Sequence, residues 1–175
     1  YYSALISLVS HRIVGAEAQL RWVHPEQGVL LPEAFIDLVK EKGLITRLGQ
    51  WMLQTACMQI TAWQQKEAPS LRMVISQSAL PLRLQDFSPE VISHALQENQ
   101  LAPQALELEL STDSNLTEST ISHLKNLKET GIQFSIDDFS LFPLLSVLPD
   151  CAINTVRLNP SLTNKMTQKQ KSAQV

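Results

Sequence analysis

The chain has 175 residues, of which 44% are hydrophobic, and this is enough apolar material for one packed domain. A complete (β/α)8 barrel needs about 250 residues, so the length predicts at most part of such a barrel. Charged residues make up 18% of the chain and the net charge is -3, which argues against a broad surface for a nucleic-acid polymer.

Short strand patterns alternate with helix patterns along the chain. In chain order, the sequence predicts a strand at Val14–Trp22, helices at Pro32–Lys42 and Arg47–Gln65, a strand at Leu71–Ile75, a helix opened by Ser88 and Pro89, a strand at Leu106–Leu110, a helix between Thr117 and Gly131, and strands at Ile132–Ile136 and Ile153–Leu158. This alternation predicts a parallel sheet with right-handed crossovers. A barrel and an open doubly wound sheet have the same order of elements, and periodicity does not separate them.

The parity of the strand residues is more informative than the order of the elements. An ordinary buried parallel strand is apolar on both faces, but four of these strand patterns carry a polar face. In chain order, that face holds Glu17 in the first of the four, Glu107 and Glu109 in the second, Ser135 and Asp137 in the third, and Arg157 in the last. These residues lie toward the C-terminal ends of the strands, where a barrel builds its active site. An antiparallel sheet with one solvated face would alternate in the same way, but the intervening helices argue against it.

Four carboxylates, Glu17, Glu109, Asp137 and Asp138, would converge at that rim. Their mutual repulsion favours a bound cation, and an oxygen-rich cluster suits Mg²⁺ or Mn²⁺. Two such ions could hold a phosphodiester and activate a water molecule for in-line attack. Each acid taken alone fits equally well as a solvated strand end, and one of the adjacent aspartates as a helix cap.

Few other features of the sequence point to chemistry. Cys57 and Cys151 lie among apolar residues, so we expect reduced core thiols, and Trp22, Trp51 and Trp63 are also expected in the core. No run approaches 18 apolar residues and no signal peptide is visible, so we expect a cytoplasmic domain that makes no membrane contact itself.

Three segments carry a resemblance to a known family. Ile13–Trp22 reads IVGAEAQLRW and resembles the segment IVGAEALLRW that names the EAL family. Leu106–Leu110 resembles the family's LELEI segment, and Phe134–Phe139 resembles the segment that contains its DDFG motif. The match runs in order from Tyr2 to about Leu162 with family-like spacing. It implies a cyclic di-GMP site at the rim of a modified (β/α)8 TIM-like barrel with one antiparallel strand.

The resemblance also implies how much of that barrel the chain contains. Residues 1–162 would form about the first three quarters of it, and residues 163–175 would form a polar tail or the start of a helix. The AEGVE-like segment and the last strands of the family are absent, so the barrel is expected to be incomplete in this chain. Degenerate members often follow membrane-anchored sensory domains, so we expect either a cytoplasmic protein or the cytosolic domain of a longer membrane-anchored one.

The family's functional positions fall on identifiable residues of this chain. The metal-binding or catalytic carboxylates fall on Glu17, Glu109, Asp137 and Asp138, and the first three would be the ligands of any metal that binds. The resemblance places Arg21 against a substrate phosphate, and Gln19, which replaces the leucine of EAL, beside it at the ligand site.

Several positions depart from the family pattern, so no intact catalytic set is expected. Ser76 replaces the metal-ligating asparagine and lacks the amide carbonyl. Arg157 replaces the catalytic lysine, and arginine is broader and does not deprotonate. Residues 140–144 replace a glycine-containing loop with bulky side chains that resist its backbone angles. Thr112 replaces a glutamate, and Asn159 replaces the aspartate of the LKID segment.

Two functional classes follow from the resemblance. The first is a degenerate EAL domain without a cofactor, acting as a non-catalytic module in cyclic di-GMP-related signalling through protein interaction, nucleotide sensing or both. The second is an active phosphodiesterase that uses Mg²⁺ or Mn²⁺ to convert cyclic di-GMP to pGpG. The combined losses favour the first class, because catalytic residues that act as one unit fail together.

A candidate interaction site follows the paired aspartates. Leu141, Phe142 and Leu144 are apolar where a loop should be polar. They fit a surface for a protein partner or for self-association, and they fit equally well side chains buried in a short helix.

Overall fold

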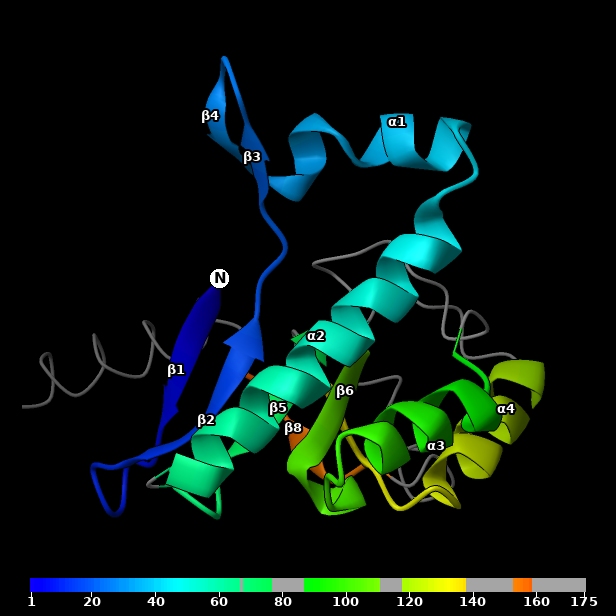
Figure 1. Ribbon diagram of the computed structural model, residues 1–175. Helices are drawn as coiled ribbons and strands as arrows, with labels where there is room; N and C mark the ends of the chain where they lie inside the picture. Colours follow the sequence, from blue (N-terminus) through cyan, green and yellow to red (C-terminus); the bar gives the residue numbers. More distant parts are fainter. Residues whose placement is uncertain (67, 77–86, 111–117, 138–152, 159–175) are drawn as a thin grey trace, which may run out of the picture.

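The computed structural model describes residues 1–66, 68–76, 87–110, 118–137 and 153–158. Its main feature is a curled sheet of six strands in the order β1-β2-β5-β6-β7-β8 (Figure 1). The strands are β1 (Tyr2–Ile6), β2 (Ile13–Ala18), β5 (Arg72–Ser76), β6 (Leu106–Leu110), β7 (Gln133–Ile136) and β8 (Thr155–Val156). β1 pairs antiparallel with β2, and all other neighbours are parallel. The predicted parallel sheet with one antiparallel strand is confirmed.

Three helices cover the outer face of this sheet: α2 (Ile45–Lys66), α3 (Pro89–Glu98) and α4 (Glu118–Lys128). The short helix α1 (Ile36–Glu41) precedes α2 and lies away from the sheet (Figure 1), and 3-10 turns lie at Pro32–Ala34 and Pro103–Ala105. The long helix α2 runs across the strands, with α3 beside it (Figure 1). Ser88 caps α3 by accepting a hydrogen bond from the backbone N–H of Val91 at 3.3 Å. Gly131 follows α4 with a φ of 88°, a conformation that favours glycine and ends the helix as predicted.

A separate two-stranded hairpin corrects one predicted strand. The strand predicted at Val14–Trp22 ends at Ala18. Trp22–His24 forms β3, which pairs antiparallel with β4 (Gly28–Leu30), and this hairpin projects away from the main sheet (Figure 1). The turn is held by Nδ1 of His24, which accepts hydrogen bonds from the backbone N–H groups of Glu26 and Gln27 at 3.2 Å each. The strand predicted from this segment was too long because its residues belong to two elements, β2 and the first strand of the hairpin, β3.

The helix predicted at Pro32–Lys42 is also divided. It consists of the 3-10 turn at Pro32–Ala34 and then α1, with Phe35 between them at a φ of -136°. Neither segment has a side-chain cap at its N-terminus. Without a capping residue that fixes a single start, the segment folds as two short turns of helix.

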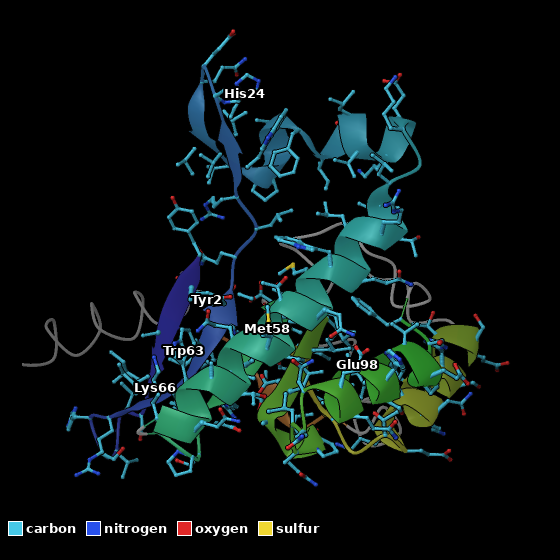
Figure 2. The ribbon with its side chains drawn as sticks, viewed as in Figure 1. Tyr2, His24, Met58, Trp63, Lys66 and Glu98 are labelled. Atoms are coloured by element: carbon cyan, nitrogen blue, oxygen red, sulfur yellow. The ribbon has the colours of Figure 1, made fainter. Side chains whose placement is uncertain are left out.

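The prediction that all three tryptophans are core residues was wrong for two of them. Trp51 is 56% exposed and Trp22 is 39% exposed. Trp51 lies on α2 one residue before Met52, so it points away from the stripe of α2 that faces the sheet. Trp63 is partly buried and packs edge-on against Tyr2 of β1, with ring centroids 5.0 Å apart (Figure 2).

The hydrophobic core lies between the helices and the outer face of the sheet. The sheet contributes alternate residues, including Met73, Leu108 and Phe134, and the helices contribute Leu53 and Leu124. Cys57 of α2 is buried in this layer, and burial raises the pKa of its thiol to about 12. This confirms the predicted core thiol at Cys57, whereas Cys151 lies outside the described residues. Within the ranges described, no helix is long and apolar enough to cross a bilayer.

Gly15 of β2 supplies a first testable prediction. It lies opposite Arg72 of β5, and a Cβ atom at this position would be 2.6 Å from the backbone oxygen of Arg72. A Gly15→Ala change must therefore push two paired strands apart. We expect the free energy of unfolding to fall by about 1–3 kcal/mol, measured by urea denaturation. A Gly43→Ala control, at a position with open space, would show only the cost of its positive φ. Unchanged stability in Gly15→Ala would contradict the close approach of the strands.

Candidate functional site

The strand register collects polar side chains on the concave face of the sheet, opposite the helices. Glu17 of β2 lies opposite Val74 of β5. Val74 is two residues before Ser76, so Glu17 and Ser76 lie on the same face of the sheet. Ser76 lies opposite Glu109 of β6, and Glu109 lies opposite Ser135 of β7. The predicted convergence of these strand ends is therefore present, and the predicted polar face is the inner face of the curl.

Arg157 bridges the two glutamates at the centre of this face. Its backbone N–H donates to the carbonyl oxygen of Ile136 at 2.8 Å, which holds it beside the end of β7. Its Nη1 donates to Oε2 of Glu17 at 2.9 Å, and its Nε forms an ion pair with Oε2 of Glu109. The Glu109 side chain is only 1% exposed, and that of Arg157 is 25% exposed. One guanidinium thus joins carboxylates from two strands that are separated by β5.

Burial and neighbouring charges shape the ionisation of these groups. Burial raises the pKa of Glu109 to about 7, against the hydrogen bond from Ser76 and the charge of Arg157, which lower it. The negative charges of Asp137 and Glu17 raise it further. For Arg157, burial disfavours the charge, but the hydrogen bond to Glu17 and the charges of both glutamates raise its pKa above the usual value. Arg157 is therefore a permanent cation in this cluster.

A second ion pair lies one step along the strands toward their N-terminal ends. Nη1 of Arg72 is 3.4 Å from Oε2 of Glu107, and the Glu107 side chain is buried. Arg72 and Glu107 lie on the same face as Ser76 and Glu109, with Arg72 four residues before Ser76 in β5 and Glu107 two residues before Glu109 in β6. Sequence reasoning did not assign Arg72 a role, although its parity with Ser76 places it on the polar face. The positive charge of Arg72 thus offsets the negative charge of Glu107 on the inner face of the sheet, below the strand ends that carry Ser76 and Glu109.

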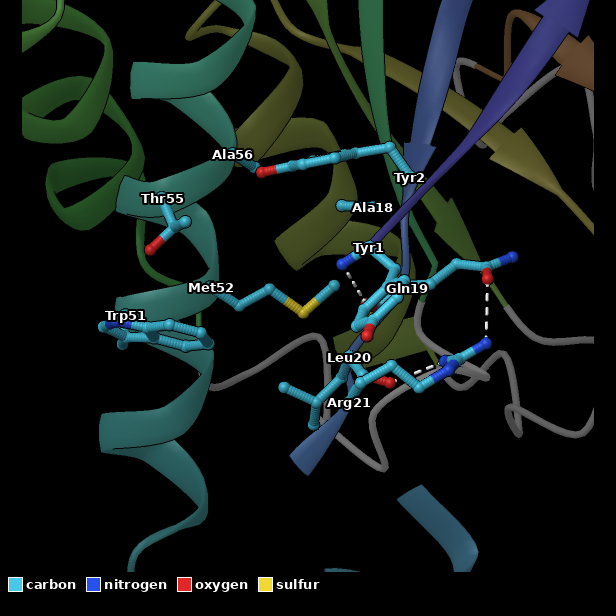
Figure 3. A pocket seen from close by; sticks show the side chains of 10 residues that line it. All are labelled: Tyr1, Tyr2, Ala18, Gln19, Leu20, Arg21, Trp51, Met52, Thr55 and Ala56. Atoms are coloured by element: carbon cyan, nitrogen blue, oxygen red, sulfur yellow. Dashed lines mark hydrogen bonds between the residues drawn. The ribbon is translucent and has the colours of Figure 1, made fainter. Parts of the chain in front are cut away.

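The two predicted ligand-binding residues contact each other. Nη2 of Arg21 donates to Oε1 of Gln19 at 2.9 Å, and Nη1 of Arg21 donates to the carbonyl oxygen of Leu20 at 2.6 Å (Figure 3). Both side chains line a small pocket of about 80 Å³ together with Tyr1 and residues of α2. A leucine at position 19 would supply no acceptor, so Gln19 gives Arg21 a fixed orientation that the family residue cannot provide.

The expected metal ligands fit a metal ion poorly. The space between Glu17 and Glu109 is taken by the guanidinium of Arg157. In the part of the chain that the structure describes, no three His, Cys, Asp or Glu side chains form a set that could hold a metal ion. Asp137 is close enough for its charge to affect Glu109, whereas Asp138 and the apolar residues Leu141, Phe142 and Leu144 lie outside the described residues.

The family relationship follows from the whole chain. The family model described as the EAL domain matches residues 1–175. The chain belongs to the EAL domain family.

Curated relatives of this EAL domain are longer proteins. An uncharacterized protein of Mycobacterium bovis is 35% identical over 161 residues, which cover 90% of this chain and 52% of the relative. The signaling protein YkoW of Bacillus subtilis is 33% identical, with 100% of this chain and 22% of the relative covered. The cyclic di-GMP phosphodiesterase NbdA of Pseudomonas aeruginosa is 30% identical, with 100% and 23% covered. The chain thus spans between about a fifth and a half of the length of these relatives.

Solved structures establish the fold of this EAL domain. The PaMucR phosphodiesterase in complex with c-di-GMP superposes with a TM-score of 0.81 at 24% identity, covering 98% of this chain and 70% of that one. The FimX EAL domain from Pseudomonas aeruginosa bound to c-di-GMP superposes with a TM-score of 0.73 at 19% identity, covering 97% and 68%. The predicted TIM-like barrel of the EAL type, incomplete in this chain, is confirmed, and the open doubly wound sheet is excluded.

Proposed function

We propose that this EAL domain is a non-catalytic regulatory module in cyclic di-GMP-related signalling. The observation that carries the proposal is the bridge made by Arg157, because it occupies the carboxylates Glu17 and Glu109 on which hydrolysis would depend. The relative NbdA is named as a cyclic di-GMP phosphodiesterase, and structures of PaMucR and FimX hold c-di-GMP. These names support the signalling context, and the altered residues of this chain support the loss of catalysis.

The chemistry of the altered positions argues against turnover. Hydrolysis of a phosphodiester needs a water molecule made nucleophilic and a centre that neutralises the developing charge. Here Arg157 has no acceptor and does not lose its proton, so it cannot act as a base. Ser76 hydrogen-bonds Glu109 and offers no amide oxygen in the place of the family's asparagine. With Arg157 paired to both glutamates, neither carboxylate is free to hold a metal ion or to activate a water molecule.

An assay of turnover tests this proposal directly. The full chain, and the same chain extended by the family's missing C-terminal segment, are incubated with cyclic di-GMP and Mg²⁺ or Mn²⁺, and pGpG is measured by chromatography. We expect release to be on the order of 1000-fold slower than with PaMucR in the same assay, because several members of one catalytic unit are changed. Turnover close to that of PaMucR would refute the proposal and favour the phosphodiesterase.

A restoration variant provides the matched positive control. Ser76→Asn and Arg157→Lys are combined, and residues 140–144 are exchanged for the family loop. Partial recovery of pGpG release in the extended chain would show that these positions, and not the scaffold, are responsible for the loss.

The second part of the proposal is binding to a protein partner or to a second copy. Leu141, Phe142 and Leu144 are the sequence feature behind it, and they lie outside the described residues. Burial of apolar side chains of this size would contribute roughly 1.5–3 kcal/mol each before the costs of association. We expect Phe142→Asp to weaken self-association in sedimentation analysis, or partner capture, while the circular dichroism spectrum stays unchanged. Unaltered association in the folded variant would contradict this part.

A further inference from the structure

The guanidinium of Arg157 lies where two carboxylate oxygens converge. Oε2 of Glu17 and Oε2 of Glu109 both face it, one at 2.9 Å from Nη1 and the other in an ion pair with Nε. These two oxygens belong to strands on either side of β5, so Arg157 joins parts of the sheet that do not pair directly. A cation held between oxygens from different strands is the arrangement that a divalent ion would otherwise provide.

We infer that Arg157 is a built-in cation that takes the place of a divalent metal and keeps Mg²⁺ and Mn²⁺ from the Glu17–Glu109 site. The inference rests on the proposed function, because it explains why this EAL domain works without a metal. It also assigns a consequence to a single side chain: removal of Arg157 should expose a latent metal site.

The exclusion follows from geometry and charge. An Mg²⁺ ion would have to approach each carboxylate oxygen to about 2.0–2.1 Å, and the nitrogens of Arg157 already occupy that approach at the same two oxygens. A metal ion would therefore have to break two charge-assisted contacts and then lie beside the displaced positive charge.

The choice of arginine strengthens the exclusion. A lysine at this position could place its compact ammonium group on one carboxylate and leave the other to a metal ion. Arginine presents several N–H donors in a rigid plane, and Arg157 uses two of its nitrogens on two different glutamates. It also stays protonated at all accessible pH values, so a metal ion cannot enter by competing with a proton. The hydrogen bond from Ser76 further restrains Glu109.

The test is Mn²⁺ binding to the full chain, measured by calorimetry, by loss of the free Mn²⁺ signal in electron paramagnetic resonance, and by the shift of Tm. The wild-type chain is expected to bind no Mn²⁺ at this site and to show no Tm shift. Arg157→Met, which removes the cation but keeps an unbranched side chain, is expected to gain saturable binding and a Tm that rises with Mn²⁺. Adding Glu17→Gln to that variant should abolish the gain.

Two further variants keep the test decisive. Arg72→Met removes the arginine of the other ion pair on this face and serves as the matched control, which should gain no Mn²⁺ binding. If Arg157→Met does not fold, Arg157→Lys retains the positive charge and should still admit Mn²⁺.

The outcomes separate this inference from the proposed function. Saturable Mn²⁺ binding to the wild-type chain that Glu17→Gln abolishes would overturn the inference, and so would a folded Arg157→Lys or Arg157→Met variant that gains nothing. Metal binding without pGpG release would leave the non-catalytic function standing. Release of pGpG by a wild-type chain that binds no Mn²⁺ would overturn the proposed function alone.

Discussion

Replacement of Phe134 by alanine is expected to lower the free energy of unfolding by about 3–5 kcal/mol, the usual cost of removing a fully buried aromatic ring. Phe134 is 0% exposed and lies in β7 opposite Leu108 of β6. Its backbone is held on the other side by Asn154, whose side-chain oxygen accepts from its N–H at 3.1 Å. Because the strand is fixed by these contacts, it cannot move to fill the space that the ring leaves.

Urea denaturation followed by circular dichroism measures this loss. Phe134→Leu should cost clearly less, since it leaves a smaller cavity, and Val23→Ala on the exposed hairpin should change stability by less than about 0.5 kcal/mol. A loss below about 1 kcal/mol for Phe134→Ala would mean that the ring is not packed as described.

Replacement of Arg157 by methionine is expected to lower the free energy of unfolding by about 2–4 kcal/mol in the absence of metal. The variant leaves Glu109 buried beside Glu17 without their shared counter-ion. Two features place the cost toward the lower end of the range for a broken buried pair. Arg157 is partly exposed, and Glu109, with a pKa already raised to about 7, can accept a proton.

A double-mutant cycle isolates the contribution of the pair. Glu109→Gln combined with Arg157→Met should be less destabilising than the sum of the single changes, because the buried position 109 then carries no charge without a counter-ion. Arg12→Met is the control at an exposed arginine and should be close to neutral. Additive losses in the cycle would show that Arg157 and Glu109 are not coupled.

The sequence predicted the main sheet well because its signals are local and regular. Alternation of glutamate with leucine in β6 identified the strand and its two faces, and Ser88 and Gly131 marked helix ends by their capping and backbone preferences. The β3–β4 hairpin was missed because its three-residue strands give too short a pattern. The exposure of Trp51 was missed because tryptophan was expected in the core as a residue type, whereas its position along α2 places it outside the buried stripe of that helix.

The sequence identified the residues of the candidate site but not the contacts between their side chains. The convergence of Glu17, Glu109 and Arg157 followed from strand parity and from the family resemblance. Their pairing could not be read from the sequence, because Glu17 and Arg157 are 140 residues apart and meet only when the sheet curls. Arg157 was therefore interpreted as a replaced lysine, and its role as the partner of two carboxylates emerged only from the structure.

The separation between Arg157 and its partners bears on how the domain is made. During synthesis both glutamates leave the ribosome before the arginine, so β2 and β6 are made before the counter-ion that their carboxylates share. The bond that joins the first part of the sheet to the last forms only after the chain has closed a very long loop, and such contacts of high sequence separation slow folding. We therefore expect the contacts of Arg157 to form late in folding, so its loss should mainly accelerate unfolding and have little effect on the folding rate.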